Sequence, residues 1–351
     1  MKYYQWIFLL IAIILILYVY NQIETSRRLS LYGNDSKKEG IIGNINYELS
    51  EVNSIKNNNQ VQIKNMSKDF INQPLKEYII KGAYNCSVSG NYVSKDMIRY
   101  VLERGCRFLD FEVVYINNKP MVSYTLDRNY EMIETNNTLL LDDALLSCVG
   151  VGFSQKSPNP KDPIFIHLRV KSKDKSIFSA IGKSVDYALR HFLYKNKITD
   201  ETKLKDVMGK VVLLLDARLD RNYHEYTKCE PSDHTCYDLS KFVNVDSGTN
   251  IISINKYSEV LNEQSIELSH SSNCNYCTNV EKYRMAIPNV IDNASNPEPK
   301  SMFIDHGIQI VPLQFHKRDE YLEQYEAFFD EYRSSFVPLS NAISYYVRNT
   351  E

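Results

Sequence analysis

Apolar residues dominate the start of the chain and then give way to a polar stretch. Residues 4–20 carry no charged side chain, and this run of about 17 residues is close to the shortest helix that can cross a bilayer. Aromatic residues flank the run at both ends, as is typical of membrane interfaces. We expect a transmembrane anchor over 1–22, with a cleaved signal peptide as the alternative. The polar residues 23–70 are expected to form a flexible tether.

The charges beside the apolar run leave the orientation open. Lys2 and the amino terminus lie on one side, and Arg27 and Arg28 lie on the other. The excess of basic residues that usually marks the cytoplasmic side is therefore almost balanced. We expect a single-pass membrane protein, and the side on which the rest of the chain lies is undetermined.

From about residue 74, short apolar runs alternate with amphipathic stretches. Ser94 before 95–104, with Gly105 after it, predicts a capped helix. The pair Asn117 and Asn118 predicts a tight turn between two strands. Further runs predict strands at 78–84, 106–115, 163–171, 210–217, 250–255, 284–288 and 307–315, and helices at 139–149 and 176–194. This alternation over 71–351 predicts an α/β fold, a closed TIM-like barrel with helices outside.

The overall charge limits the class of partner. The formal net charge is −2, so the strongly basic surface needed by nucleic-acid-binding proteins is not expected. Composition is otherwise that of a folded globular protein. We therefore expect no nucleic-acid partner.

The seven cysteines leave three chemistries open. Cys274 and Cys277 form one close pair, and Cys229 and Cys236 form another. A structural zinc site, with His270 as a further ligand, would need both pairs close together. Free thiols in loops are a second possibility. Disulfides within the two loops are a third, and they would imply a lumenal or extracellular domain.

Two carboxylates lie late in one predicted strand. Asp110 and Glu112 are two residues apart, so they share a face of the strand. Barrels build their sites at the carboxyl ends of strands, where paired carboxylates suit a hard cation such as Ca²⁺. Two acids facing solvent on an edge strand are the alternative.

The stretch 74–126 resembles the X region of phosphoinositide-specific phospholipase C. That region has the pattern P-L-x-x-Y-x-I-x-x-S-H-N-T-Y-L, followed by a helix that ends in R-G-C-R and by an acidic strand. The positions that match in register are Pro74, Leu75, Tyr78, Asn85, Arg104, Gly105, Cys106 and Arg107. We assign 71–195 to the X-like half.

The second half, 205–345, resembles the Y region of the same family. The matching positions are Pro288, Asn296, Met302, Gly307, Gln309, Val311, Leu313 and Phe315. One extra residue is needed before Gly307. The resemblance implies a TIM-like barrel that acts on phosphoinositides, with Ca²⁺ in the eukaryotic branch.

The family's two catalytic histidines are replaced here. The resemblance places Tyr84 at the histidine that stabilises the phosphoryl transition state, and Tyr124 at the histidine that acts as general acid. A tyrosine near its reference pKa of about 10 is a poor proton shuttle at neutral pH. It also lacks the positive charge of an imidazolium. We expect neither tyrosine to carry out the family's proton chemistry.

The implied metal site is altered as well. Asn85, Asp110 and Glu112 stand at ligand positions, but Arg169 stands where the family has a glutamate. The sequence predicts an ion pair from Arg169 to Asp110 and Glu112, which competes with a metal ion. We expect no cofactor, or Ca²⁺ only if this vestigial site still works.

The implied phosphate-binding positions have lost their cations. Leu214 and Asp216 replace two family lysines, and Met285 aligns with a family arginine. A slip of one residue would let Arg284 take its place, so Arg284 and Arg169 are the candidate ligand-binding residues. His167 lies on a predicted strand and is expected to be a core histidine with satisfied partners.

Two functions follow from the resemblance. We expect a membrane-anchored phospholipase C-like protein that has lost catalysis and binds a lipid headgroup or a protein partner. The alternative is an active phosphoric diester hydrolase that acts on a phospholipid with altered catalytic residues. Retention of Asn85, Asp110 and Glu112 is the feature that favours the alternative.

Overall fold

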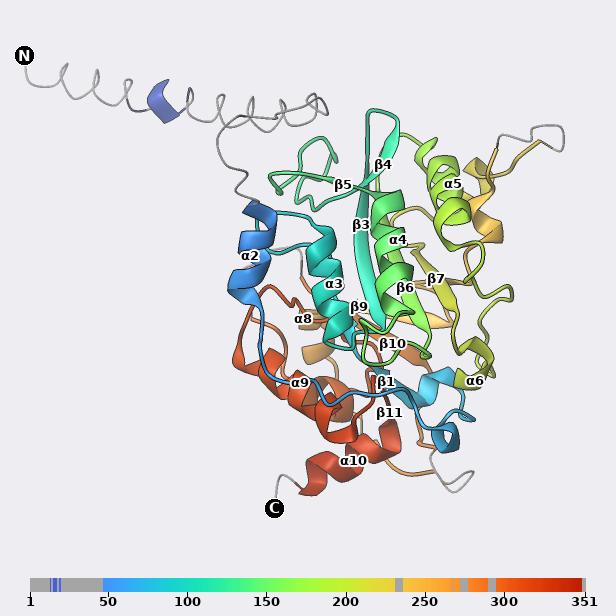
Figure 1. Cartoon of the computed structure of the whole chain (residues 1–351). Helices are drawn as coiled ribbons and strands as arrows, with labels where there is room; N and C mark the ends of the chain where they lie inside the picture. The colour runs from blue at the N-terminus through green and yellow to red at the C-terminus, as the bar shows by residue number, and fades with distance from the viewer. Residues whose placement is uncertain are drawn as a thin grey trace, which may run out of the picture.

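Parallel strands form the centre of the molecule, and helices cover them on the outside (Figure 1). The computed structural model describes residues 47–348 except 231–235, 267, 272–276 and 290–294, together with 13, 15–17 and 19. Neighbouring parallel strands follow the order β2 (Gly82–Ala83), β3 (Phe108–Ile116), β6 (Ile164–Lys171), β7 (Val211–Asp216), β8 (Val245–Ser247), β9 (Ile252–Lys256) and β10 (Tyr283–Ile287). Antiparallel pairs add β4 (Lys119–Val122) and β5 (Leu139–Leu140) beside β3, and join β1 (Tyr78–Ile80) to β11 (Phe336–Pro338).

The segment 307–315 closes the ring of strands. Ile310 forms isolated parallel bridges with both Ile80 and Met285, and Leu313 forms one with Ala83. The prediction of a regular strand over 307–315 is wrong, because only these single bridges form. Pro312 lies within the segment and has no N–H for a continuous ladder. The segment still joins the two edges of the sheet, so the strands form a barrel.

Three predicted helices form, over 95–104, 139–149 and 176–194, and the other helices of the described residues were not predicted. Ser94 caps α3 by accepting a hydrogen bond from the N–H of Met97, and Gly105 follows the helix with a φ of 83°. The predicted cap and stop of this helix are confirmed. The longer helices are α2 (Tyr47–Ile55), α3 (Lys95–Glu103), α4 (Leu141–Gly152), α5 (Ile177–Leu189), α9 (Glu320–Tyr332) and α10 (Leu339–Arg348), and the short ones are α6 (Leu204–Val207), α7 (Tyr223–Tyr226) and α8 (Tyr257–Leu261).

A tight turn between β3 and β4 lies at one end of the barrel (Figure 1). Asn117 and Asn118 have φ values of 51° and 59°, the left-handed pair that a two-residue hairpin of type I′ requires. The predicted turn is confirmed. Because β3 runs in the direction of the other parallel strands, this end is the mouth formed by their carboxyl ends.

The apolar side chains form two main cores, one inside the barrel and one around it. The inner core fills the barrel with residues such as Tyr78, Ile80, Phe165, Leu214 and Met285. Residues at alternate positions of the same strands face outward and pack against α3, α4, α5 and α9. The strands are therefore buried on both faces, which explains their nearly continuous apolar sequences.

Residues 47–70 pack against the barrel, which corrects this part of the tether predicted over 23–70. Val52 is fully buried, Ile63 is 3% exposed, and the N–H of Lys64 donates to the carbonyl of Arg333 at 2.9 Å. Glu51 accepts hydrogen bonds from the loop after β2, including one from Asn91. A few irregularly spaced apolar side chains and specific hydrogen bonds hold this stretch against the barrel. Its polar composition gave no sign of this packing.

The predicted anchor over 1–22 falls almost wholly outside the described residues, and 23–46 falls wholly outside them. Within the part of the chain that the structure describes, no helix is long and apolar enough to cross a membrane. The first described helix of the domain, α2, begins at the end of the barrel that carries the β3–β4 turn (Figure 1).

Candidate functional site

The predicted carboxylates and their cationic partner meet just below the mouth of the barrel. β3 and β6 pair in parallel with Asp110 opposite His167 and Glu112 opposite Arg169. These side chains share one face of the two strands, because residues two apart on a strand point the same way. Asn85 follows β2 with a φ of 42°, and its N–H donates to Asp110 at 3.1 Å. An asparagine tolerates this left-handed backbone better than most residues do.

Arg169 binds all three residues that were predicted as metal ligands. Its Nε and Nη2 donate to the carboxylate of Asp110 at 3.0 and 2.9 Å, and its Nη1 donates to Glu112 at 2.7 Å. Nη2 also donates to Oδ1 of Asn85 at 2.6 Å. The predicted ion pair is confirmed, and both carboxylate side chains are fully buried. The guanidinium stands where a cation would be bound, so these side chains as they stand do not fit a calcium ion.

The charges of this cluster stabilise one another. Burial alone would raise the pKa of Asp110, but the nearby Arg169 and the hydrogen bond to His167 outweigh burial and hold the pKa below its usual range. Burial opposes the charge of Arg169 as well, yet Asp110 and Glu112 raise its pKa above the usual value. Arg169 and Asp110 therefore both stay ionised at neutral pH.

His167 joins Asp110 to Ser247 beneath the cluster. Its Nδ1 lies 2.8 Å from Oδ1 of Asp110, and its Nε2 lies 2.8 Å from Oγ of Ser247. The order carboxylate, imidazole and hydroxyl is that of a hydrolase triad. All three residues have zero exposure, however, so a substrate has no access to the hydroxyl. His167 is a core histidine with satisfied partners, as predicted, and it helps to hold Asp110 in place.

The two tyrosines lie at the same mouth as Arg169. Tyr84 is 8% exposed, and its ring lies under the guanidinium with Cζ of Arg169 4.4 Å from the ring centroid. Burial raises the pKa of Tyr84 more strongly than Arg169 lowers it, so the phenol stays protonated. Tyr124 follows β4 and is partly buried beside the same cavity.

A small cavity opens above this cluster. Its volume is about 90 Å³, well below the 300–1,000 Å³ typical of ligand pockets. It is lined by Tyr84, Tyr124, Thr125, Leu126, Arg169, Lys171, Asp216, Arg218, Leu219, Lys256, Ile287 and Asn289. These residues come from the ends of β2, β4, β6, β7, β9 and β10, so the cavity is the mouth predicted for a barrel site.

The expected loss of positive charge from this mouth is only partly right. Leu214 is buried in the inner core, and Asp216 pairs with Arg218 at 2.8 Å. Lys171 and Lys256, which were not predicted as site residues, supply new cations from β6 and β9. Burial, followed by repulsion from Arg169 and Arg218, lowers the pKa of Lys256 to about 8. Each lysine ends a strand, but no local motif in the sequence marks it.

The structure does not bring Arg284 to this mouth. Arg284 lies near the start of β10, where it pairs with Glu263 and donates to the carbonyl of His306 at 2.7 Å. The adjacent Met285 faces the inner core, so Arg284 faces outward by the alternation of the strand. Its assignment to the site by a slip of one residue is therefore corrected.

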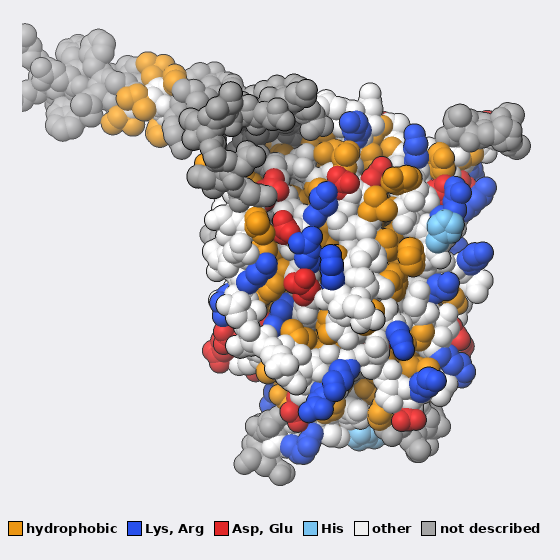
Figure 2. Space-filling model, in the orientation of Figure 1, with side chains coloured by type: hydrophobic (Ala, Val, Ile, Leu, Met, Phe, Trp, Pro, Cys, Tyr) orange, Lys and Arg blue, Asp and Glu red, His pale blue; other side chains and the backbone are white. Residues whose placement is uncertain are grey.

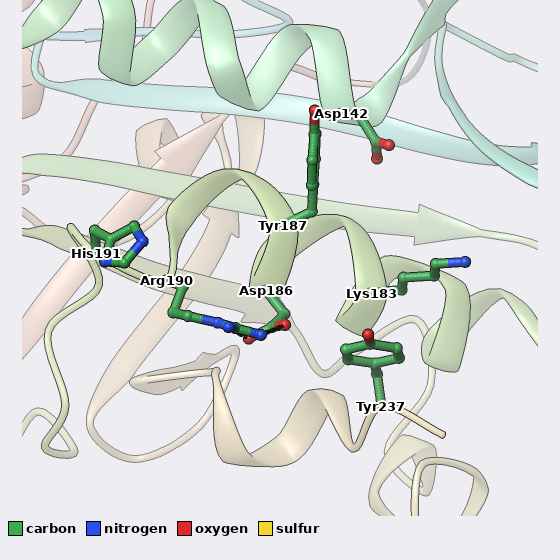
Figure 3. Close-up of a pocket in the computed structure, with 7 residues that line it drawn as sticks. All are labelled: Asp142, Lys183, Asp186, Tyr187, Arg190, His191 and Tyr237. Carbon is green, nitrogen blue, oxygen red and sulfur yellow. Dashed lines mark hydrogen bonds and ion pairs between the residues drawn. The ribbon is translucent and has the colours of Figure 1, made fainter. Parts of the chain in front are cut away.

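Larger cavities lie on the outside of the barrel. One of about 350 Å³ is lined by Asp142 of α4, by five residues of α5 and the turn that follows it, and by Tyr237 (Figure 3). Two of its charges, Asp186 on α5 and Arg190 directly after the helix, form an ion pair (Figure 3). Another, of about 640 Å³, includes Arg284. Neither contains residues of the Tyr84 and Arg169 cluster.

The described cysteines include a disulfide. Cys229 and Cys236 are joined, and Cys86, Cys106 and Cys148 are free and buried. Within the described ranges, no group of three or more His, Cys, Asp or Glu side chains could hold a metal ion. The sequence left zinc, free thiols and disulfides open, and in the loop between Cys229 and Cys236 the disulfide forms.

Comparison with known structures identifies the fold. No family model matches the chain, and no curated protein matches it significantly in sequence. The barrel is similar to PLC21 of L. pealei, with 13% identity over 76% of this chain and a TM-score of 0.57, and to PLC21 of S. officinalis, with 14% identity, the same coverage and a TM-score of 0.55. The chain spans 37% of the length of each of these proteins. Arg169 and the two tyrosines thus lie at the mouth of a barrel with the fold of phosphoinositide-specific phospholipase C.

Proposed function

We propose that this protein is a membrane-anchored, catalytically degenerate phospholipase C-like protein that binds a lipid headgroup at the barrel mouth. The observation that carries the proposal is the hydrogen bonding of Arg169 to Asn85, Asp110 and Glu112. The barrel keeps its mouth and several cations there. The same residues that would hold a metal instead neutralise an internal arginine, so binding remains while metal-assisted chemistry is lost.

The side chains at the family's histidine positions support this proposal. Phosphodiester cleavage needs a group that can donate a proton to the leaving oxygen near neutral pH. Tyr84 has a raised pKa because it is buried, so it stays protonated and does not shuttle protons. His167, the nearest histidine to the cluster, is fully buried and engaged with Asp110 and Ser247. No described imidazole lines the cavity.

One observation favours the alternative of an active phosphoric diester hydrolase with altered catalytic residues. Lys256 lines the cavity and has a pKa lowered to about 8, chiefly by burial. A lysine with a pKa near neutral can act as a general acid or base. In that case Lys256 would act as the proton donor in place of the family histidine that Tyr124 replaces, and hydrolysis would not require calcium.

The position of α2 suits an anchor over residues 4–20. α2 begins at the mouth end of the barrel, and Glu48 near its start accepts a hydrogen bond from Asn137 at 2.6 Å (Figure 1). A chain that leaves a membrane anchor would therefore reach the domain on the side of the mouth. Alkaline carbonate extraction of the full chain tests the anchor, and release into the supernatant would contradict it.

The headgroup proposal is tested with the full chain in detergent micelles. Calorimetry should detect binding of glycerophosphoinositol, and the same protein should release no inositol phosphate from phosphatidylinositol with or without Ca²⁺. Robust hydrolysis would favour the alternative. Absence of binding to the headgroup would leave the mouth without its proposed ligand and would overturn this part of the proposal.

A further inference from the structure

The buried charges at the base of the mouth form a balanced group. Arg169 pairs with Asp110 and Glu112, and Lys171 pairs with Glu112 at 3.0 Å. Lys171 also donates to the carbonyl of Thr125 at 2.8 Å. Two cations and two carboxylates therefore cancel, and their hydrogen bonds are directed at one another. This group offers little net attraction to a ligand.

The upper wall holds a second balanced pair and one further cation. Arg218 pairs with Asp216 through two hydrogen bonds of 3.0 and 2.8 Å. The side chain of Lys256 has only a long contact of 3.4 Å from its Nζ to the carbonyl of Pro288, and no ion pair with it is found among the described residues. The backbone N–H of Lys256 donates to the carboxylate of Glu259 at 2.6 Å. The charged side chains of the mouth thus leave one positive charge in excess, on Lys256.

We infer that Lys256 is the anion-binding residue of the mouth and that it takes a singly charged phosphodiester group. This inference rests on the proposed headgroup function and narrows it. A cavity of about 90 Å³ suits a phosphate group better than a whole polyphosphorylated headgroup. A phosphodiester carries one negative charge, which the excess charge of Lys256 neutralises. A dianion would leave one buried charge uncompensated, which is costly.

The rim suggests where the rest of the ligand lies. Leu126 and Leu219 line the cavity and are 42% and 39% exposed. Apolar side chains beside an anion site favour a phosphodiester that carries an apolar group. The shared chemistry is the phosphodiester, and its two possible sources are a phospholipid and a soluble glycerophosphodiester.

The pH response follows from the surroundings of Lys256. The charged groups that face its side chain are Arg169 and Lys171 on β6 and Asp216 and Arg218 from the end of β7, and the carboxylate of Glu259 on α8 lies at its backbone N–H. Burial and three of these cations lower its pKa to about 8. The protonated amine attracts the anion and the neutral amine does not. Affinity should therefore be steady below pH 8 and fall about tenfold for each pH unit above it.

Calorimetry on the full chain in detergent micelles tests the inference with three probes at pH 7 and pH 9.5. The probes are glycerophosphoinositol, short-chain phosphatidylinositol and inositol monophosphate. We expect Lys256→Gln to weaken binding of both diesters about 10- to 100-fold and to remove the pH dependence. Lys282→Gln, which changes an exposed lysine beside the outer cavity of Arg284, is the matched control and should bind like the unmodified protein.

The outcomes separate this inference from the proposed function. Diester binding that survives Lys256→Gln overturns the role of Lys256 and leaves headgroup binding standing. A monoester that binds more than tenfold tighter than the diesters overturns the preference for a single charge. Tighter binding of the short-chain lipid than of the soluble diester identifies the lipid as the source, and equal binding identifies the soluble diester; both support the site. Absence of binding to every probe overturns both proposals.

Discussion

The guanidinium of Arg169 lies over the ring of Tyr84, with its Cζ 4.4 Å from the ring centroid. A cation is attracted to the face of an aromatic ring, so this contact stabilises both side chains. A protonated histidine in place of Tyr84 would instead bring a second positive charge against Arg169. Tyr84 in place of a histidine and Arg169 in place of a glutamate are therefore compatible with each other. Restoring only one of these two family residues would not restore the family's site.

This match predicts the behaviour of the histidine variants. Tyr84→His together with Tyr124→His should not yield measurable release of inositol phosphate, because Arg169 would lower the pKa of a neighbouring imidazole and keep it neutral. Loss of a general acid alone typically costs about 10²–10⁴-fold in rate. The assay is hydrolysis of phosphatidylinositol in mixed micelles at several pH values. Activity of the double variant would show that only the proton chemistry had been lost.

Calcium should not stabilise the unmodified protein. Arg169→Glu would supply a third carboxylate beside Asp110 and Glu112, and without metal it should lower the free energy of unfolding by about 3–5 kcal/mol, as loss of a buried partner does. Millimolar Ca²⁺ should then raise the unfolding temperature of the variant. Thermal unfolding with and without Ca²⁺ measures both effects.

The control for that experiment is Arg190→Gln, which breaks an exposed pair with Asp186 on α5. Its unfolding free energy should change by about 0.5 kcal/mol or less and should not depend on Ca²⁺. A calcium-dependent shift in the unmodified protein would show that the guanidinium of Arg169 can be displaced by the metal.

The segment before the barrel should contribute to stability. A chain that begins at residue 69 loses the burial of Val52, Ile63 and Met66, and a chain that begins at residue 45 keeps it. Each fully buried apolar side chain contributes about 1.5–3 kcal/mol, and the protein partly collapses into the gaps that the three side chains leave. The free energy of unfolding of the shorter chain should therefore be lower by roughly 3–6 kcal/mol. Urea unfolding of the two chains compares them directly. Equal midpoints would mean that 47–68 does not pack as described.

Asp162 should make the protein less stable as the pH rises from about 4 to about 6. Asp162 is fully buried, accepts from the N–H of Met66 at 2.9 Å and lies near Arg107. Burial raises its pKa to about 6, so in this range the folded protein holds a proton that the unfolded chain has released. The unfolding free energy should therefore fall by roughly 3 kcal/mol across the window.

Asp162→Asn is the test of that prediction. The amide oxygen can still accept from Met66, while the titration is removed. Unfolding by urea at several pH values should show that the variant lacks the decline between about pH 4 and pH 6. Parallel pH profiles for the two proteins would contradict the assignment to Asp162.

Much of the barrel could be predicted because local signals and the fold agree. Ser94 and Gly105 bound α3 by ordinary capping chemistry, and Asn117 and Asn118 mark their turn. The ion pair of Arg169 could be predicted because strand alternation fixes its face. Site residues that reach the mouth only through the pairing register of their strands could not be predicted. Lys256 is the main example, because its place at the mouth depends on where β9 ends relative to the neighbouring strands.

Other features depend on contacts far apart in sequence. Ile63 packs where a side chain at Gly105 would need space, because its Cδ1 lies 2.6 Å from the point that a Cβ on Gly105 would occupy. Polar composition around Ile63 gives no sign of that contact. On the face shown in Figure 2, acidic and basic side chains are interspersed and apolar ones lie between them. Such a surface reveals no site from composition alone, and the mouth is found only from the assembled barrel.

The disulfide between Cys229 and Cys236 bears on which half of a bilayer the mouth would meet. Disulfides persist in oxidising compartments and are rare in the cytosol. If the barrel lies in such a compartment, the proposed anchor would hold the mouth against the leaflet that faces away from the cytosol. Anionic lipids are concentrated in the opposite, cytoplasmic leaflet. The mouth would then meet a lipid surface with little net charge. On such a surface the phosphodiester of a single lipid is the negative charge that the one excess positive charge of the mouth can bind.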